Sequence, residues 1–207
     1  MGFIEYFSNQ ARKPSGFVGR YIISRIFENG NSIINNFVFE TMDLQKDDCV
    51  LEIGFGPGKL IQRMAGVIEN GRIDGVDFSG SMYDVASKRN RIPIQNQRVS
   101  LKTGDFEKIE FNSAEYHQIC CVNTIYFWTY PVQILNRIYD LLKPGGRLVL
   151  GFTVKNQLEN RKLSRDVFRF YEAEEIREML AECRFQKIQI HERKSGRSLF
   201  HCMTAFK

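Results

Sequence analysis

Residues 50–61, VLEIGFGPGKLI, pass from an apolar run through three glycines into a helical pattern. The glycines have the spacing GxGxG, whereas the loop that cradles a dinucleotide pyrophosphate has GxGxxG. Glu52 precedes the first glycine by two residues. A carboxylate at this place is unfavourable for a phosphate but favourable for an ammonium group or for hydroxyls. The stretch therefore predicts a ligand that has a cationic end and no pyrophosphate.

The segments after this loop alternate between strand and helix patterns. Strand candidates are 49–55, 72–78, 98–105, 117–123 and 146–154, and helical patterns lie between them at 59–70, 81–90 and 131–142. Strands that are apolar on both faces and separated by helices indicate a parallel sheet covered by helices. After Thr153 come a polar stretch, a helix at 172–183, and two strands, 185–192 and 198–207, joined by KSGRS. We expect these two strands to form a hairpin that closes the sheet.

The 207 residues are enough for one domain with a sizeable core. The first 45 residues read as two helices, 17–27 and 32–42, split by a turn. We expect a single domain, residues 1–207, in which residues 1–45 form a helical cap and residues 46–207 form the core.

The composition, 43% hydrophobic and 26% charged, is typical of a soluble globular protein. No apolar run approaches the roughly 20 residues that span a bilayer, and the start lacks the pattern of a secretory signal. The five cysteines are odd in number and form no CxxC pair, which argues against a zinc site or a disulfide framework. These features predict a cytoplasmic protein without a bound metal.

The net charge of +5 is spread over short basic groups with acids between them. This distribution suits a solvated surface, and it leaves open attraction of an anionic substrate or of RNA. No aromatic and basic residues alternate as in RNA-binding modules, so we expect no stable nucleic-acid partner.

Acidic residues at the ends of later strands point to an adenosine. Asp77 ends the second strand, where an acid holds ribose hydroxyls. Asp105 ends the third strand, in TGDF, and is placed to accept from the exocyclic amine of adenine. Phe78, Met82 and Phe106 are positioned to sandwich the purine ring. S-adenosylmethionine, which combines an amino acid, a sulfonium cation and an adenosine, fits this pattern.

Each of these residues also has a structural interpretation. The glycines can serve a tight turn alone, Asp77 can cap a helix that begins near Ser79, and Met82 can belong to the core.

Five stretches, EIGFGPG, GVDFSGSM, TGDF, CCVNTIYFW and LKPGGRLVLGF, follow one another over about residues 48–154. This series resembles the motifs of class I S-adenosylmethionine-dependent methyltransferases, of the small-molecule type that includes quinone-biosynthesis enzymes. The resemblance implies a Rossmann-like, seven-stranded, mostly parallel sheet of order 3-2-1-4-5-7-6, with the last strand antiparallel and helices on both faces. The cofactor contacts that it implies are Glu52, Gly54, Gly56 and Gly58 in the loop, Asp77 at the ribose, Met82, Asp105 and Phe106 at adenine, and Asn123 beside the methionine part. Asn123 can instead satisfy backbone groups at its strand end.

The region after Thr153 has no signature of the quinone enzymes, so their substrate is not carried over. Methyl transfer from a sulfonium is an in-line displacement that positioning and exclusion of water can promote, so we assign no catalytic base. The exit of the fourth strand, NTIYFWTYP, lacks the Asn/Asp-Pro-Pro-aromatic motif that often marks enzymes acting on amide or adenine nitrogens.

We expect a small, partly apolar methyl acceptor. Tyr126 and Trp128 would line its pocket, or would only pack the following helix. Residues 1–45, with Phe17 and Tyr21, and residues 155–171 would form a lid. The alternatives are an RNA or protein methyltransferase with the same cofactor site, a non-enzymatic nucleotide-binding protein, and a dinucleotide oxidoreductase. The GxGxG spacing with Glu52 argues against the oxidoreductase.

Overall fold

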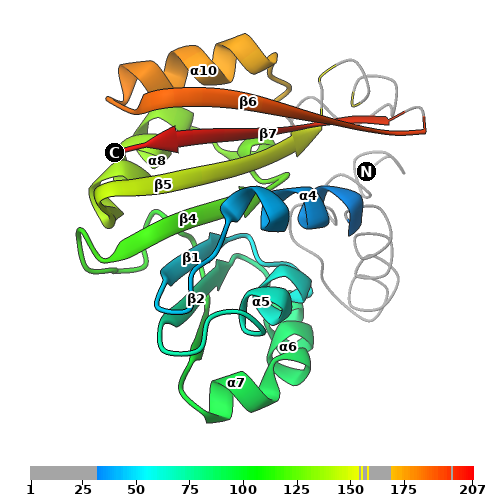
Figure 1. Ribbon diagram of the computed structural model, residues 1–207, viewed down its shortest axis with the longest axis vertical. Coiled ribbons are helices and arrows are strands. Elements are labelled where there is room, and N and C mark those ends of the chain that lie inside the picture. Colours follow the sequence, from blue (N-terminus) through cyan, green and yellow to red (C-terminus); the bar gives the residue numbers. More distant parts are fainter. Residues whose placement is uncertain (1–31, 154, 156–157, 159–168, 197) are drawn as a thin grey trace.

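The computed structural model describes residues 32–153, 155, 158, 169–196 and 198–207 (Figure 1). The predicted helix at 17–27, with Phe17 and Tyr21, lies outside the described residues.

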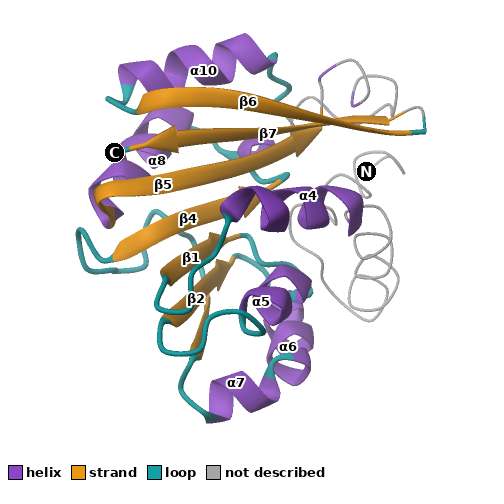
Figure 2. Cartoon of the chain, in the orientation of Figure 1, coloured by secondary structure: helices purple, strands orange, loops and turns teal. Residues whose placement is uncertain are grey.

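A seven-stranded sheet forms the middle layer of the protein, as Figure 2 shows. Its order is β3-β2-β1-β4-β5-β7-β6, which confirms the predicted order. The strands are β1 (Cys49–Ile53), β2 (Arg72–Asp77), β3 (Val99–Thr103), β4 (Tyr116–Val122), β5 (Leu142–Thr153), β6 (Gln186–Ser195) and β7 (Ser198–Phe206). The first five strands pair in parallel, and β7 is antiparallel to both β5 and β6. The predicted hairpin between the last two strands is confirmed.

The helices cover both faces of this sheet. They are α4 (Ser32–Met42), α5 (Lys59–Met64), α6 (Gly80–Arg89), α7 (Arg91–Gln95), α8 (Pro131–Leu141) and α10 (Ala173–Glu182), with a short 3₁₀ helix, η2 (Ile125–Phe127). One apolar cluster joins α4, α5 and the start of β1 at Val50, and a second joins α8, α10 and the next strand residue, Leu51. Successive strand residues therefore face opposite layers, as the pleat of a buried strand requires.

Helix α4 lies within the segment that the sequence assigned to a cap. Ile34, Phe37, Val38 and Met42 are buried against the sheet, and the helix crosses β4 and β5 in Figure 1. A Cβ atom on Gly151 of β5 would collide with Val38, so the absence of a side chain there allows the helix to approach the strand closely.

Two details differ from the sequence-based expectations. Helix α5 ends at Met64 rather than near residue 70, because the amides of Glu69, Asn70 and Gly71 donate to the carbonyl of Lys46 instead of continuing the helix. Helix α7, which contains Pro93, and the 3₁₀ helix η2 were not predicted, since each spans too few residues to show a helical period.

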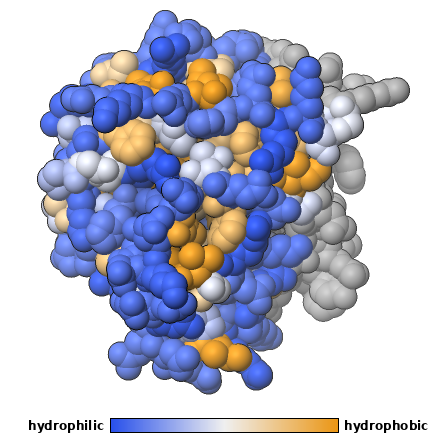
Figure 3. All heavy atoms as spheres, viewed as in Figure 1, coloured by the Kyte–Doolittle hydropathy of each residue, from blue (hydrophilic) through white to orange (hydrophobic). Residues whose placement is uncertain are grey.

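The surface seen in Figure 3 is mostly hydrophilic, with hydrophobic side chains in small separate groups. Among the described residues, no helix has the length and apolar character needed to cross a membrane.

Candidate functional site

The GxGxG loop begins at the carboxyl end of β1, which pairs with β2 on one side and with β4 on the other. At this point the strand order reverses, and ligands of open α/β sheets bind here. The Gly54 amide donates to the carbonyl of Val76 at 2.7 Å, so the loop starts tightly against β2. The loop then turns into α5, whose N-cap residue is Gly58.

The glycines of the loop serve different purposes. Gly58 has φ of +72°, and a Cβ atom there would lie 2.7 Å from both the Ala86 Cβ and the Asn90 Nδ2 atoms. This glycine therefore allows close packing of the loop against α6. Gly56 has φ of +51°, but a Cβ atom there would meet no described residue within 4 Å. The backbone of Gly56 thus borders open space that a ligand can enter.

Asn90 holds the loop from the end of α6, and the sequence reasoning missed it. Its buried side-chain amide donates to the carbonyl of Gly58 at 3.1 Å and to that of Ala86 at 2.9 Å. A polar residue at the end of a helix is ordinary in sequence, so only its position beneath the loop reveals this contact.

Asp77 joins the loop to the turn between β2 and α6. One carboxylate oxygen accepts from the Gly56 amide at 2.7 Å, and the other accepts from the Ser79 amide at 2.8 Å. Ser79 is itself the N-cap of α6, with its hydroxyl accepting from the Met82 amide at 3.4 Å. Burial raises the pKa of Asp77, while the two amide bonds oppose the rise. The carboxylate is therefore held between two loops of the site, and the cap of α6 comes from the neighbouring serine.

Glu52 is the second carboxyl of the site, and unlike the partly buried Asp77 it is fully buried. Its side chain is only 3% exposed, and its Oε2 atom has no hydrogen-bond partner among the described residues. Burial, and then the charge of Asp77, raise the pKa of Glu52 well above its usual range, while the amide of Ile61 opposes this. A buried polar atom without a partner is costly, so it calls for a water molecule or a ligand. The site has the negative character that an ammonium group would stabilise.

Asp77, predicted to hold the ribose, and Asp105, predicted to hold adenine, follow from neighbouring strands, β2 and β3. Asp77 is in register with Thr103, and the Gly104 amide donates to the Asp77 carbonyl at 2.9 Å. Asp105, which comes next, accepts from the Glu107 amide at 3.1 Å. Of the predicted ring contacts, Phe78 is exposed, whereas Met82 and Phe106 are buried. Their contact with adenine stays a prediction.

Asn123 and Tyr126 follow β4 on the other side of the loop. Asn123 has a positive φ of +54°, which is uncommon for a residue other than glycine, and its amide donates to the carbonyl of Gly151 at 2.8 Å. The Tyr126 hydroxyl lies 3.1 Å from the Asn123 Oδ1 atom and 3.0 Å from the Thr153 carbonyl. The Tyr126 carbonyl accepts from the Arg169 amide at 2.9 Å. Tyr126 therefore ties together the ends of β4 and β5 and the chain at residue 169.

Trp128 is buried in the same apolar cluster as Tyr126. The prediction that these two residues contact an acceptor stays open. His117 lies at the opposite, amino end of β4, where its Nδ1 atom accepts from the Cys49 amide at 2.8 Å.

The sheet order, the glycine loop at the reversal point and the carboxyls of Glu52 and Asp77 beside it define the class of the protein. They are the features of the Rossmann-like methyltransferases that use S-adenosylmethionine. Comparison with known families agrees, because residues 50–146 match a family model described as a methyltransferase domain. This part of the chain is a methyltransferase domain.

Individual relatives support the same assignment. The chain is 28% identical over 120 residues to YdaC of Bacillus subtilis (strain 168), named as an uncharacterized methyltransferase, covering 58% of this chain and 64% of the relative. It is 28% identical over 116 residues to the ubiquinone/menaquinone biosynthesis C-methyltransferase UbiE of Neisseria gonorrhoeae (strain NCCP11945), covering 56% and 46%. The chain thus spans less than two thirds of the length of these relatives.

A solved structure of Haemonchus contortus phosphoethanolamine N-methyltransferase 2 in complex with S-adenosyl-L-methionine superimposes with a TM-score of 0.79 at 17% identity. The superposition covers 100% of this chain and 60% of that one. The likeness shows that the two proteins share a fold.

Proposed function

We propose that this chain transfers a methyl group from S-adenosylmethionine to a small, partly apolar acceptor. One observation carries the proposal. Among the described residues, the Gly56 backbone borders open space at the reversal point of the sheet. Its amide donates to Asp77, and it follows the buried Glu52 by four residues. A ligand with a cationic amino acid and a ribose would place opposite charge and hydroxyl donors at these two groups.

The two carboxyls have capacity for such a ligand. Each oxygen of an ionised carboxylate accepts about two hydrogen bonds. The bonds of Asp77 from Gly56 and Ser79 use one position on each oxygen, which leaves others for ribose hydroxyls. The unpartnered Oε2 atom of Glu52 would accept from the ammonium group or from a water molecule that it holds.

The adenine would lie at the ends of β2 and β3. Asp105 would accept from the exocyclic amine, with Phe78, Met82 and Phe106 around the ring. Asn123 would lie beside the methionine part, because it follows β4 next to the loop.

When bound, the cofactor supplies a methyl group on a sulfonium, which is a strong leaving group. The acceptor atom forms a bond to the methyl carbon while the carbon–sulfur bond breaks and its electron pair stays on sulfur. The chain would contribute binding, alignment and exclusion of water. We assign no residue the role of a base.

We propose that the acceptor is a small molecule. We also propose that the reaction takes place in the cytoplasm. Two relatives are named for small-molecule chemistry, ubiquinone/menaquinone biosynthesis and phosphoethanolamine methylation. Tyr126 and Trp128 follow β4 beside the methionine end of the site. Phe17 and Tyr21, with residues 155–171, are proposed to close over the acceptor.

A matched pair of variants tests the cofactor site. Gly56→Ala and Gly145→Ala both place a methyl group at a residue of positive φ, +51° and +75°, with nothing within 4 Å. Both should carry a similar backbone strain, of order 1–3 kcal/mol. Only Gly56→Ala should reduce the affinity for S-adenosylhomocysteine, measured by titration calorimetry, about tenfold or more. Equal affinities for the two variants, or binding of NAD in place of S-adenosylhomocysteine, would contradict the proposal.

The acceptor is tested separately, with a labelled methyl donor and a panel of small aromatic and lipid acceptors. Deletion of residues 1–30 should abolish methylation and leave binding of S-adenosylhomocysteine largely intact, because the loop and its acids lie later in the chain. Methylation of intact RNA or protein by the truncated chain, with no small acceptor accepted by the full chain, would overturn this part.

A further inference from the structure

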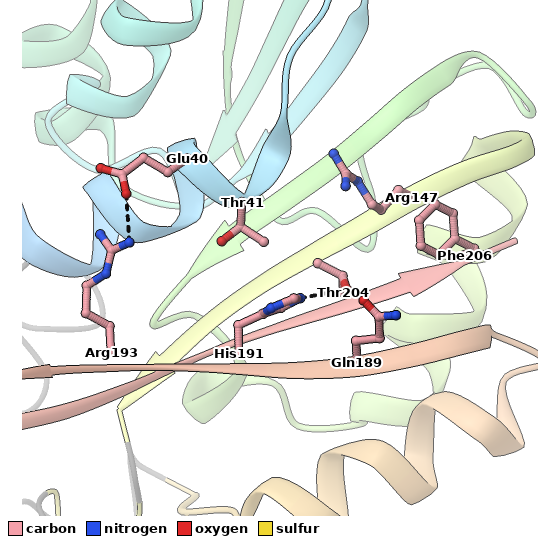
Figure 4. A pocket seen from close by; sticks show the side chains of 8 residues that line it. All are labelled: Glu40, Thr41, Arg147, Gln189, His191, Arg193, Thr204 and Phe206. Atoms are coloured by element: carbon pink, nitrogen blue, oxygen red, sulfur yellow. Dashed lines mark hydrogen bonds and ion pairs between the residues drawn. The ribbon is translucent and has the colours of Figure 1, made fainter.

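A second pocket lies on the α4 face of the sheet, away from the glycine loop. Its volume is about 310 Å³, and it opens between the end of α4 and strands β5, β7 and β6 (Figure 4). The side chains around it are Glu40, Thr41, Arg147, Gln189, His191, Arg193, Thr204 and Phe206. Arg147 precedes Thr153, at the carboxyl end of β5, by six residues, or about 20 Å along the strand. The pocket is therefore separate from the proposed cofactor site.

The pocket lies where α4 ends over the sheet. Helix α4 ends at Met42 while the strands continue past it, and the alternation of β6 turns Gln189, His191 and Arg193 toward the face on which α4 packs (Figure 4). On the neighbouring strand, Thr204 is in register with Gln189. Three strands thus contribute polar side chains to one concave surface.

Arg147 is one of two arginines that line this surface, and it lies near Phe206 (Figure 4). Its guanidinium donates to the Met42 carbonyl and to the Gln118 Oε1 atom, the latter at 3.1 Å. Among the described residues, no carboxylate lies within ion-pair distance of it. Burial lowers the pKa of Arg147, and the charges of Asp43 and Asp48 oppose this only from a greater distance. The guanidinium has five N–H donors, so it retains donors for a further anion.

The rest of the lining is also rich in donors. Glu40 is the one acidic residue among the eight lining side chains, and it is already paired with Arg193 at 2.7 Å. The guanidinium of Arg193 is held over the Phe37 ring at 4.4 Å. The His191 Nε2 atom lies 3.4 Å from the Thr204 hydroxyl, and Gln189 adds an amide. With histidine neutral, the lining side chains carry one more positive than negative charge.

We propose that this pocket binds the phosphate group of a small phosphoester. A phosphate presents several oxygens in different directions, which suits donors that come from β5, β6 and β7 at once, whereas a carboxylate presents only two oxygens in one plane. Arginine pairs well with phosphate because its fork matches two oxygens. The volume equals that of roughly ten water molecules, so it leaves room for a small organic group attached to the phosphate. Phe206 provides an apolar wall for that group.

Thermal unfolding in the presence of glycerol 3-phosphate tests the proposal, with glycerol and with sodium chloride at matched ionic strength as controls. A ligand that binds only the folded protein raises the melting temperature in a saturable way. We expect a rise of several degrees for the wild-type chain and none for the double variant Gln189→Ala/His191→Ala, which keeps both arginines and the bonds that they make to Met42, Gln118 and Glu40. Lys194→Gln, which removes a charge from the opposite face of β6, should respond as the wild type does.

The outcomes are decisive in both directions. A smaller rise with inorganic phosphate than with glycerol 3-phosphate supports a phosphoester, and equal rises support a phosphate site that takes the free ion. No rise in the wild type beyond the salt control, or an equal rise in the double variant, overturns the proposal. The double variant should bind S-adenosylhomocysteine with a dissociation constant within twofold of the wild-type value. That result would show that the double variant is folded. It would also show that the loss of the phosphoester response does not arise from damage to the cofactor site.

Discussion

Replacement of Glu52 by glutamine should make the protein more stable at neutral pH and at the same time weaken its affinity for S-adenosylhomocysteine. The side chain is 3% exposed, its Oε2 atom lacks a partner among the described residues, and burial raises its pKa well above the usual range. Glutamine has nearly the same shape and keeps an oxygen for the Ile61 amide, but it carries no charge to bury.

The direction in which stability changes with pH follows from proton linkage. Because the pKa of Glu52 is raised in the folded protein, the folded state binds the proton more tightly than the unfolded state does. Stability from this carboxyl is therefore fully present below about pH 4.5 and is lost as the pH rises through the folded-state pKa. Each unit by which the pKa is raised corresponds to about 1.36 kcal/mol. The pKa of Asp77 is also raised, so Asp77 makes stability fall with rising pH in the same direction. This contribution remains in the Glu52→Gln variant.

The stability gain at pH 7.5 comes from removal of the buried charge, because the glutamine amide leaves one polar atom without a partner just as the carboxyl does. It should be at least about 1.4 kcal/mol, the energy that corresponds to a pKa raised by one unit. For a domain of this size each kcal/mol shifts the melting temperature by about 2–4 °C. Loss of a charged acceptor should weaken binding of the ligand's ammonium group by about 1.5–3 kcal/mol, or roughly tenfold or more.

Urea unfolding between pH 4 and pH 8 measures the first effect, and calorimetry with S-adenosylhomocysteine measures the second. The control is Glu69→Gln, which neutralises an exposed carboxylate paired with Lys46 and should change both quantities little. If Glu52→Gln is no more stable than the wild type at pH 7.5 and binds the ligand equally well, the carboxyl is neither a buried charge nor a ligand contact, and the reasoning fails.

Three further predictions follow from the same geometry. Gly58→Ala should cost about 1–3 kcal/mol in urea unfolding, since its Cβ atom would lie 2.7 Å from that of Ala86; Gly80→Ala, in open space within α6, should be neutral or slightly stabilising, and equal losses would refute the packing argument. Asp77→Ala should weaken binding of S-adenosylhomocysteine about tenfold or more, measured by calorimetry, and unchanged affinity would restrict this residue to a structural role. Tyr126→Phe should lower the free energy of unfolding by about 1–3 kcal/mol, because its hydroxyl bonds backbone at the end of β5, and no loss would contradict the bond.

Much of the fold could be predicted from local pattern. Alternating apolar strands and amphipathic helices indicate a parallel sheet with helices on both faces, and the KSGRS turn indicates the final hairpin. Both predictions are confirmed, as is the strand order that the motif resemblance implied. The glycine spacing and the acids at strand ends placed the site at one edge of the sheet, because the carboxyl ends of parallel strands meet there.

The partners of individual side chains could not be predicted in this way. A tyrosine after a strand is equally compatible with a pocket wall and with packing against the following helix. Only the folded chain brings the Tyr126 hydroxyl to Thr153, 27 residues later. The Asn90 side chain likewise donates to the carbonyl of Gly58, and Arg147 of β5 donates to the carbonyl of Met42 at the end of α4. Both partners are far away in sequence.

The physical reason is the range of the forces involved. Periodicity and turn chemistry depend on neighbours a few residues apart, so the sequence by itself determined most of the elements, their layers and the position of the glycine loop. A hydrogen bond or a pocket depends on the angle and depth at which helices pack on the sheet. Only the tertiary structure therefore decided that Asp77 joins two loops and that one oxygen of the buried Glu52 has no partner among the described residues. It also decided that a donor-lined pocket lies beside the end of α4, over β5, β7 and β6.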